Sequence, residues 1–420
     1  MSSPPEARRP LGGFDATTVG VGSMVGAGAF VVFAPAGAAA GVLLPLAVVV
    51  AGFVAYTNAS AMALLAGGLP ADGAVDGREQ LGSWPGFLAG WAQLTGRLAA
   101  CAAVALTTGL YAAPGSAGSA AIAAVAAVAV TTLPALLGVT RSATLTRAVI
   151  SLVIPVLAFA IVVGLTSPAS SAAIGGGPGA TPGVGGVLQG AGLLVFAYAG
   201  YGRSATLGHG VREPRRNIPA VVLGSLGVTL GLYVLLSFSL LRSLGPFMLA
   251  ETTVPLRELI RGATGAGSAG VLGAVITGAA VLAGLGGLVS LTAGLGGRAL
   301  ALSRRGELPE TFSRVSTRYR APWVSILGAA AVVVVLLLTV QLPTLIGCAA
   351  FGVLVHGAIV GIAALRVEDR RWFAPRWLNA VGAAGCLALA LALPWGSVLG
   401  MLTVLAAGAV LRGISSRRHR

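Results

Sequence analysis

Long apolar runs separated by short polar segments make up most of the chain. A helix needs about 20 apolar residues to cross a bilayer. The runs that predict membrane-spanning helices are 13–36, 42–67, 84–112, 117–137, 147–166, 186–208, 218–242, 268–300, 323–341, 343–365, 377–394 and 395–412. Charged residues are only 9% of the total, against roughly 25% in soluble proteins. The pattern therefore predicts an all-α integral membrane protein with twelve transmembrane helices.

The first run carries a glycine cluster near its middle, which reads Gly22-Ser23-Met24-Val25-Gly26-Ala27-Gly28. Glycine costs a helix interior about 1 kcal/mol relative to alanine. The cluster therefore predicts an unwound stretch whose free N–H groups would line a binding site for a negatively charged group. Small residues also let membrane helices pack closely, so a packing role is the open alternative.

A second cluster interrupts the sixth run, with the sequence Phe196-Ala197-Tyr198-Ala199-Gly200-Tyr201-Gly202. A Gly/Ser/Pro-rich segment, 167–185, separates the fifth run from the sixth. Two repeats of five helices, each with a broken first helix, give this arrangement. Because five is odd, the second repeat enters the membrane from the opposite side. Inverted repeats of this kind hold substrate near the midplane, which favours a transporter site over simple packing.

The predicted domain organisation follows from these boundaries. It comprises a cytoplasmic N-terminal tail (1–12), a first five-helix repeat (13–166), an extracytoplasmic linker (167–185), a second, inverted five-helix repeat (186–365), helices 11 and 12 (377–412) and a cytoplasmic tail (413–420). A facilitator with six-plus-six architecture would instead carry its long linker after the sixth run.

Arginine accounts for the whole basic excess, because the chain contains no lysine and the net charge is +15. The arginines lie mainly in short loops between apolar runs, which is a topological signal and not a nucleic-acid surface. With the N-terminus inside, only Arg242, Arg257 and Arg261 fall outside, while Arg97 and Arg203 stay within runs. We therefore expect a multi-pass protein of the cytoplasmic membrane with both termini cytoplasmic.

The sequence offers little for enzyme chemistry. Its three cysteines lie inside apolar runs and do not form a disulfide framework. We find no nucleophile motif, no phosphate loop followed by lysine and no metal-ligand spacing, so neither an enzyme nor a cofactor is predicted.

Ionisable residues within the runs are candidates for coupling or gating, because charge inside a bilayer is costly. Asp15 and Arg203 lie toward the cytoplasmic ends of the first and sixth runs, and we hypothesise that they form an ion pair. Arg97 lies about 20 Å into the third run. It either bonds backbone carbonyls or acts near the substrate.

Histidines and tyrosines near the second cluster allow two interpretations each. His209 would sit at the inner mouth, where it could relay protons or cap a helix end. His356, in the tenth run, is open to the same two kinds of role, and the interpretation as a satisfied interior histidine is preferred. Tyr198 and Tyr201 supply either hydroxyl ligands or packing, and packing is preferred.

Four stretches resemble the amino acid–polyamine–organocation (APC) superfamily of permeases. GSMVGAGAF (22–30) is similar to their first-helix signature, and FAYAGYGRSATLGHGVREPRRNIP (196–219) to their sixth helix and the following loop. ALSRRGELPETFSRVSTRYRAPW (301–323) is similar to their loop between helices eight and nine, and GVTRSATLTR (138–147) to the loop before helix five. The resemblance implies a LeuT-like five-plus-five inverted repeat with helices 1 and 6 broken, plus two C-terminal helices.

The resemblance also implies a substrate site. Backbone amides of the first helix would hold an amino acid's carboxylate, carbonyls of the sixth would hold its ammonium, and Phe196 would close over it. By position the implied substrate-binding residues are Ser23, Gly26, Ala27, Gly28, Phe196, Ala197, Ala199 and Gly200. Helix N-terminal amides suit an anion and unwound carbonyls suit a cation.

Three departures from the family pattern narrow the expectation. Gly202 and the pair His209-Gly210 stand where many relatives carry acidic residues, and Val153 stands where some carry a coupling lysine. A lysine-based mechanism is thereby excluded. We expect secondary active transport of a neutral amino acid by alternating access, coupled to protons or to exchange. The alternatives are an amine, polyamine or cationic amino acid permease of the same fold, or a substrate sensor that does not transport.

Overall fold

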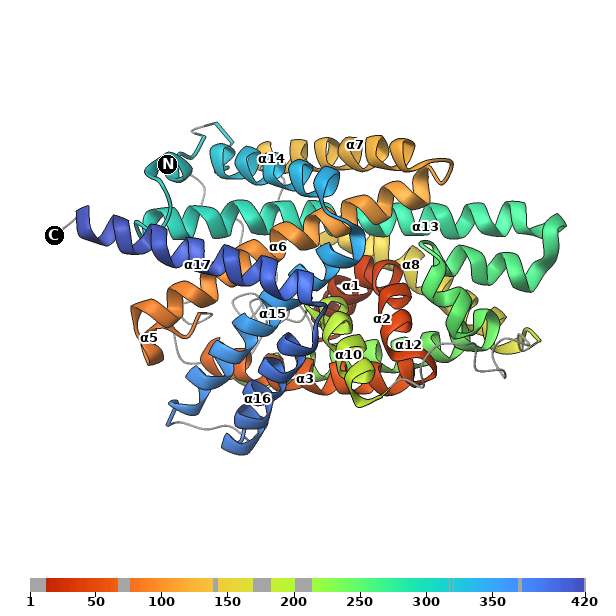
Figure 1. The fold of residues 1–420 in the computed structure, drawn as a ribbon, viewed down its shortest axis with the longest axis horizontal. Coiled ribbons are helices and arrows are strands. Elements are labelled where there is room, and N and C mark those ends of the chain that lie inside the picture. Colours follow the sequence, from red (N-terminus) through yellow and green to blue (C-terminus); the bar gives the residue numbers. More distant parts are fainter. Residues whose placement is uncertain are drawn as a thin grey trace, which may run out of the picture.

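The protein is described by a computed structural model that covers residues 13–66, 76–138, 143–168, 183–200, 214–316, 318–319, 321–368 and 372–418. Within those ranges the chain is helical and forms no strand (Figure 1). The helices are α1 (Gly13–Val31), α2 (Phe33–Ala40), η1 (Gly41–Leu43), α3 (Leu44–Ala66), α5 (Arg78–Leu81), α6 (Ser83–Ala112), α7 (Ala117–Leu136), α8 (Ala143–Thr166), α10 (Val184–Tyr198), α12 (Pro214–Glu251), α13 (Pro255–Arg304), η3 (Glu310–Ser313), α14 (Trp323–Thr339), α15 (Leu342–Leu365), α16 (Arg376–Ala392) and α17 (Trp395–Arg418).

Within the described residues every predicted apolar run lies on helical structure, and the all-helical membrane class is confirmed. Eight helical stretches in the described part of the chain are long and apolar enough to cross a membrane by length and composition. Four further apolar helices are shorter. Several boundaries match the hydropathy pattern because a membrane helix must satisfy every backbone hydrogen bond within itself. Helices α12 and α13 instead extend beyond the runs 218–242 and 268–300.

The predicted interruption of the first helix is corrected by the structure. Helix α1 continues through 22–28, and the irregular residue is Val32, which separates α1 from α2. The Val32 N–H still donates to the Gly28 carbonyl at 3.3 Å. The glycines are used for close approach: a Cβ on Gly22 would overlap the Ile150 side chain, and one on Gly28 would lie 2.7 Å from the Ala197 Cα. Packing, the alternative interpretation, accounts for them here.

Helix α10 ends where the second cluster begins. Its last helical residue is Tyr198, and the Ala199 N–H donates to the Phe196 carbonyl at 3.2 Å in a tightened final turn. Residues 201–213 lie outside the described ranges, so a continuation of this helix beyond the interruption stays a prediction.

Helices from the two halves of the chain pair reciprocally. Helix α1 packs against α12, and α10 packs against α3; α6 packs against α15, and α13 packs against α8. The same reciprocity holds for α6 with α7 and α13 with α14, and α7 lies beside α14 along the top of Figure 1. These helix contacts of one half therefore have counterparts in the other half.

The last two helices are added to the outside of this arrangement. Helix α16 packs on α15, α3 and α10, whereas α17 packs on α15 and α6. Helices α1, α2 and α10 meet at the centre of the view in Figure 1. The meeting point of α1 and α10 is therefore enclosed by the rest of the bundle.

Candidate functional site

Helices α1 and α10 touch backbone to backbone where the two glycine clusters meet. A Cβ on Gly200 would overlap the carbonyl of Ser23, and one on Gly28 would lie 3.1 Å from the Ala197 carbonyl oxygen. The Ser23 hydroxyl is a donor within reach of two carbonyl oxygens, that of Gly20 at 2.8 Å and that of Gly200 at 3.0 Å. The structure thus brings together Ser23, Gly28, Ala197 and Gly200, which are four of the predicted substrate-binding residues.

The C-terminal end of α10 presents backbone carbonyls to this crossing. Carbonyls in the last turn of a helix carry the negative pole of the helix dipole; here the Phe196 carbonyl accepts from the Ala199 N–H. Phe196 and Ala197 are buried, while Ala199 and Gly200 are partly exposed. This helix end is chemically suited to a cation such as an ammonium group.

The α1 side of the crossing is different. Gly26 and Ala27 lie in the interior of a continuous helix, where backbone N–H groups donate to carbonyls one turn back. In this packing they do not point at a ligand. A carboxylate could reach them only where α1 opens.

Helix α12 supplies a third wall, which the sequence analysis missed. The Tyr233 hydroxyl donates to the Met24 carbonyl oxygen at 2.9 Å and lies 3.4 Å from the Ala197 carbonyl oxygen. Its ring meets Phe33 and Tyr198 edge-on, with centroids 5.5 and 5.2 Å apart. A tyrosine inside an apolar run gives no sequence signal of such a contact.

Tyr198 itself belongs to packing, as the sequence analysis preferred. It is fully buried, and its hydroxyl donates to the Val48 carbonyl on α3 at 3.3 Å. It therefore ties α10 to α3 on the side away from α1.

The predicted coupling residues are only partly placed by the structure. Arg97 lies on α6 with its guanidinium against α13, since a Cβ on Gly294 would be 3.3 Å from Nη1. Asp15 lies on α1, but its side chain is outside the described part, as are Arg203 and His209 entirely. The Asp15–Arg203 ion pair and the relay role of His209 stay predictions.

His356 is an interior histidine whose two ring nitrogens both have partners. Nδ1 lies 3.3 Å from the Ala89 carbonyl oxygen, and Nε2 lies 3.3 Å from the Gln93 amide nitrogen. A carbonyl can only accept, so Nδ1 carries the proton and Nε2 accepts from Gln93. This arrangement joins α15 to α6 with a neutral imidazole.

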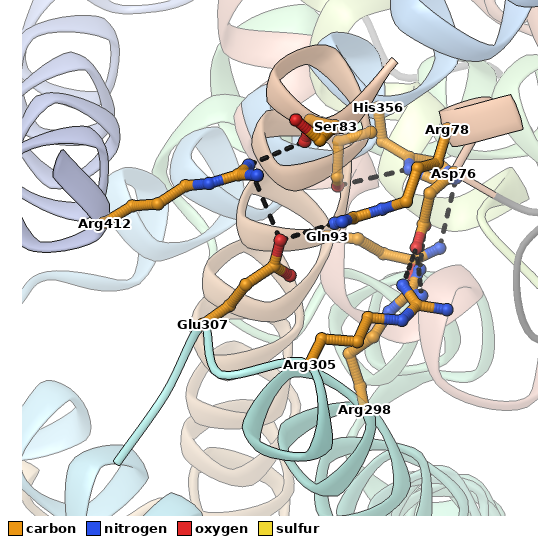
Figure 2. Close-up of polar contacts among 10 residues, drawn as sticks. Asp76, Arg78, Ser83, Gln93, Arg298, Arg305, Glu307, His356 and Arg412 are labelled. Atoms are coloured by element: carbon orange, nitrogen blue, oxygen red, sulfur yellow. Dashed lines mark hydrogen bonds and ion pairs between the residues drawn. The ribbon is translucent and has the colours of Figure 1, made fainter. Parts of the chain in front are cut away.

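A network of buried charges lies close to His356 (Figure 2). Asp76, which is fully buried, contacts Arg298 at 2.9 Å and Arg305 at 3.4 Å. The next residue, Gly77, has φ +64°, a left-handed conformation that favours glycine. That turn directs the chain from the Asp76 carboxylate into α5.

Glu307 is the second acid in this network. Its Oε1 contacts Arg78 at 2.6 Å and Arg412 at 3.5 Å. The Arg412 guanidinium also donates to the Ser83 carbonyl at 2.6 Å and lies over the rings of Trp84 and Phe87, 4.8 Å from each centroid. Arg412 thereby attaches the end of α17 to the start of α6.

The arginines of the network come from four places in the chain that the charge pattern assigns to the cytoplasm. Arg78, Arg298, Arg305 and Arg412 meet around Asp76 and Glu307 (Figure 2). Helix α5 and the C-terminal part of α17, which carry two of them, lie at the left of Figure 1. Hydropathy and charge patterning predicted that they share a face. Their acidic partners were not identified, because one sequence does not show which residues separated by more than 100 positions meet.

The fold is a bundle of apolar helices of the multi-pass membrane type. It closes around the crossing of α1 and α10, where backbone polar groups meet. These two features define the class of membrane transporters. Residues 11–410 match the amino acid permease family, and the chain belongs to that family, within the APC superfamily.

Relatives cover nearly the whole chain. An uncharacterized transporter of Mycobacterium tuberculosis is 41% identical over 99% of this chain and 94% of its own length. The branched-chain amino acid permease BcaP of Bacillus subtilis is 25% identical over 98% of this chain and 94% of its own. A methylthioribose transporter of the same organism is also 25% identical, with the same coverage.

Proposed function

We propose that this permease is a secondary active transporter that moves a neutral amino acid across the cytoplasmic membrane by alternating access. The observation that carries the proposal is the end of α10 at Tyr198, where the buried Ala197 carbonyl lies against Gly28 of α1. Carbonyls at a helix end attract an ammonium group, and the family supplies the expectation of an amino acid.

The carboxylate half of the site requires a change in α1. We infer that the helix opens over 23–28 when substrate binds, because an interior glycine weakens a helix by about 1 kcal/mol relative to alanine. The amides of Ser23, Gly26, Ala27 and Gly28 then become donors for the carboxylate. The glycine cluster thus serves packing in the closed crossing and binding in the open one.

The reciprocal helix pairing supports a five-plus-five repeat with twelve crossings. Helices α1 to α8 form the first repeat and α10 to α15 the second, with 167–185 between them and α16 and α17 outside. Inverted repeats allow one set of helices to rock against the other around a central site. Both termini would face the cytoplasm.

A neutral substrate agrees with the pairing of the two buried acids of the bundle. The buried acids Asp76 and Glu307 are already paired with arginines at one end of the bundle, so neither supplies a counter-charge for a cationic side chain. The similarity to a branched-chain amino acid permease agrees with an aliphatic substrate. Coupling to protons or to exchange follows from the family expectation.

Uptake into proteoliposomes tests this function. Labelled leucine, valine, alanine, arginine, putrescine and methylthioribose are offered with and without an inward proton gradient, and with or without unlabelled substrate inside. We expect saturable uptake of a neutral amino acid, raised by the gradient or by internal substrate. Uptake of methylthioribose or putrescine alone overturns the proposal, and binding without uptake identifies a sensor.

A further inference from the structure

Tyr233 lies where α1, α10 and α12 come together. The substrate contacts proposed so far do not involve its hydroxyl oxygen. The side chain is fully buried. Its hydroxyl contacts the carbonyl oxygens of two different helices, those of Met24 on α1 and Ala197 on α10. No other described contact links all three helices through one atom.

The hydroxyl has only one proton for two carbonyls. The distance to Met24 is 2.9 Å and that to Ala197 is 3.4 Å, so the proton goes to Met24 by the usual geometry of an O–H donor. A tyrosine oxygen also accepts hydrogen bonds. The Tyr233 oxygen and the Ala197 carbonyl oxygen are then two acceptors that face one another, and no donor within the described ranges bonds to both.

The ring is held in this orientation by its neighbours. Phe33 and Tyr198 contact it edge-on at interplanar angles of 82° and 70°, an arrangement favoured by the ring quadrupoles. The phenol oxygen therefore keeps its place even when its hydrogen-bond partners change.

We propose that the Tyr233 hydroxyl oxygen is a ligand for the amino group of the substrate, together with the Ala197 carbonyl. An ammonium group has three donors and would satisfy both oxygens, at the negative end of α10. Because Gly28 and Ala197 are in contact, the amino group enters as α1 and α10 separate. This inference rests on the proposed transport of an amino acid.

The arrangement sets a specificity. Two neutral oxygens accept hydrogen bonds and offer none toward the ligand, since the phenol proton is committed to Met24. A primary ammonium fits this pair, whereas a hydroxyl in its place leaves one oxygen without a donor. The α-hydroxy acid of the same carbon skeleton should therefore be a poor substrate, and an N,N-dimethyl amino acid should be weaker than its parent.

Tyr233→Phe tests the inference, with Tyr198→Phe as its matched control. Both tyrosines are fully buried, and both hydroxyls donate to a backbone carbonyl. We expect Tyr233→Phe to raise KM for the best amino acid at least tenfold and to leave KM for its α-hydroxy analogue unchanged. Tyr198→Phe should change neither KM by more than about twofold. Thermal unfolding in detergent, measured on both, reports any shared loss of packing.

A second variant keeps the ring and the hydroxyl in place. Incorporation of 3-fluorotyrosine at 233 makes the oxygen a weaker acceptor and a stronger donor. A ligand role predicts a higher KM for the amino acid; a role limited to donating to Met24 predicts an equal or lower KM, which overturns the inference. Equal KM changes in Tyr233→Phe and Tyr198→Phe also overturn it. If the wild-type protein takes up no amino acid at all, the proposed function fails instead.

Discussion

Two glycines, which have no side chain, set the distance between α1 and α10. Gly28 and Gly200 allow the two backbones to touch, because a Cβ at either position would press on backbone atoms of the other helix. Backbone atoms do not move aside as a flexible side chain does, so these two positions admit only glycine in the observed packing. The closed crossing therefore depends on them more directly than on any apolar side chain.

The first prediction concerns Gly28→Ala. Its Cβ would lie 2.7 Å from the Ala197 Cα, and overpacking of this kind costs about 1–3 kcal/mol. We expect a lower midpoint of thermal unfolding in detergent and slower uptake. The control is Gly231→Ala on α12, where a Cβ has open space, and its midpoint should be unchanged or higher. Equal effects of the two substitutions would contradict the packing account.

At this scale the sequence could single out the two glycine clusters that meet, but not the backbone conformation of the first one. The cluster 22–28 was predicted to belong to a substrate site, which stays a prediction, and the same glycines serve either an unwound backbone or a close contact. The choice depends on what faces them, and Ile150 and Ala197 are distant in sequence. Tyr233 could not be found either, because its contacts depend on two backbone carbonyls that hydropathy does not describe.

Whole helices are held together at their ends by charge. Arg412 connects α17 to α6 through Ser83, Glu307 and the faces of two aromatic rings. A planar guanidinium makes all these contacts at once, whereas a lysine ammonium stacks less well and cannot form the same fork. The attachment of α17 should therefore require arginine at this position.

A second prediction follows for that position. Arg412→Ala should lower the thermal unfolding midpoint, with a loss of roughly 1–2 kcal/mol, because α17 loses its cation–π contacts with Trp84 and Phe87. Arg412→Lys should recover little of it. Arg261→Ala is the control, because that side chain is 73% exposed and its ion pair with Glu258 is 3.8 Å long. Full recovery by lysine would show that charge alone matters.

The third prediction concerns the buried carboxylate that joins the loop before α5 to the end of α13. Asp76→Asn leaves Arg298 and Arg305 without their counter-charge, and removing one partner of a buried pair costs about 3–5 kcal/mol. We expect a large fall in the unfolding midpoint, partly reversed when Arg298→Met is added. Glu79→Gln, at an exposed carboxylate on α5, should have no effect. Failure of the second substitution to restore stability would argue against direct pairing.

Element boundaries were the most predictable feature. The run 84–112 was realised as Ser83–Ala112 and 343–365 as Leu342–Leu365, since a helix in lipid must satisfy its own backbone. Helix-end pairing was not predictable. Asp76 meets Arg298 across 222 residues and Arg78 meets Glu307 across 229, and charge patterning shows only that such residues share a side of the membrane.

For the molecule as a whole, the clustered arginines support the predicted orientation with both termini in the cytoplasm. The reciprocal helix pairing supports the predicted five-plus-five repeat. A basic excess in short loops marks the cytoplasmic side, and the network of Figure 2 gathers four of those arginines at a single end. The α12–α13 connection, with Arg257 and Arg261, lies at the opposite end.

Orientation is the fourth prediction. A green fluorescent protein fused after residue 420 should fluoresce in cells, and alkaline phosphatase fused there should be inactive. A single cysteine placed within 169–182, in a background without the three native cysteines, should react with a membrane-impermeant maleimide added outside. The opposite pattern in either assay would invert the assigned topology.

The interface between α6 and α15 is tighter than the corresponding interface between α13 and α8. On α6 and α15, Gly96 and Gly352 meet without side chains, and a Cβ on Gly352 would lie 2.6 Å from the Ala92 carbonyl oxygen. On α13 and α8, Gly286 faces Val149 at an ordinary 3.4 Å. Interlocked backbones resist sliding, while a valine surface permits it. We therefore expect α8 to move against α13 during transport, while α15 stays fixed on α6.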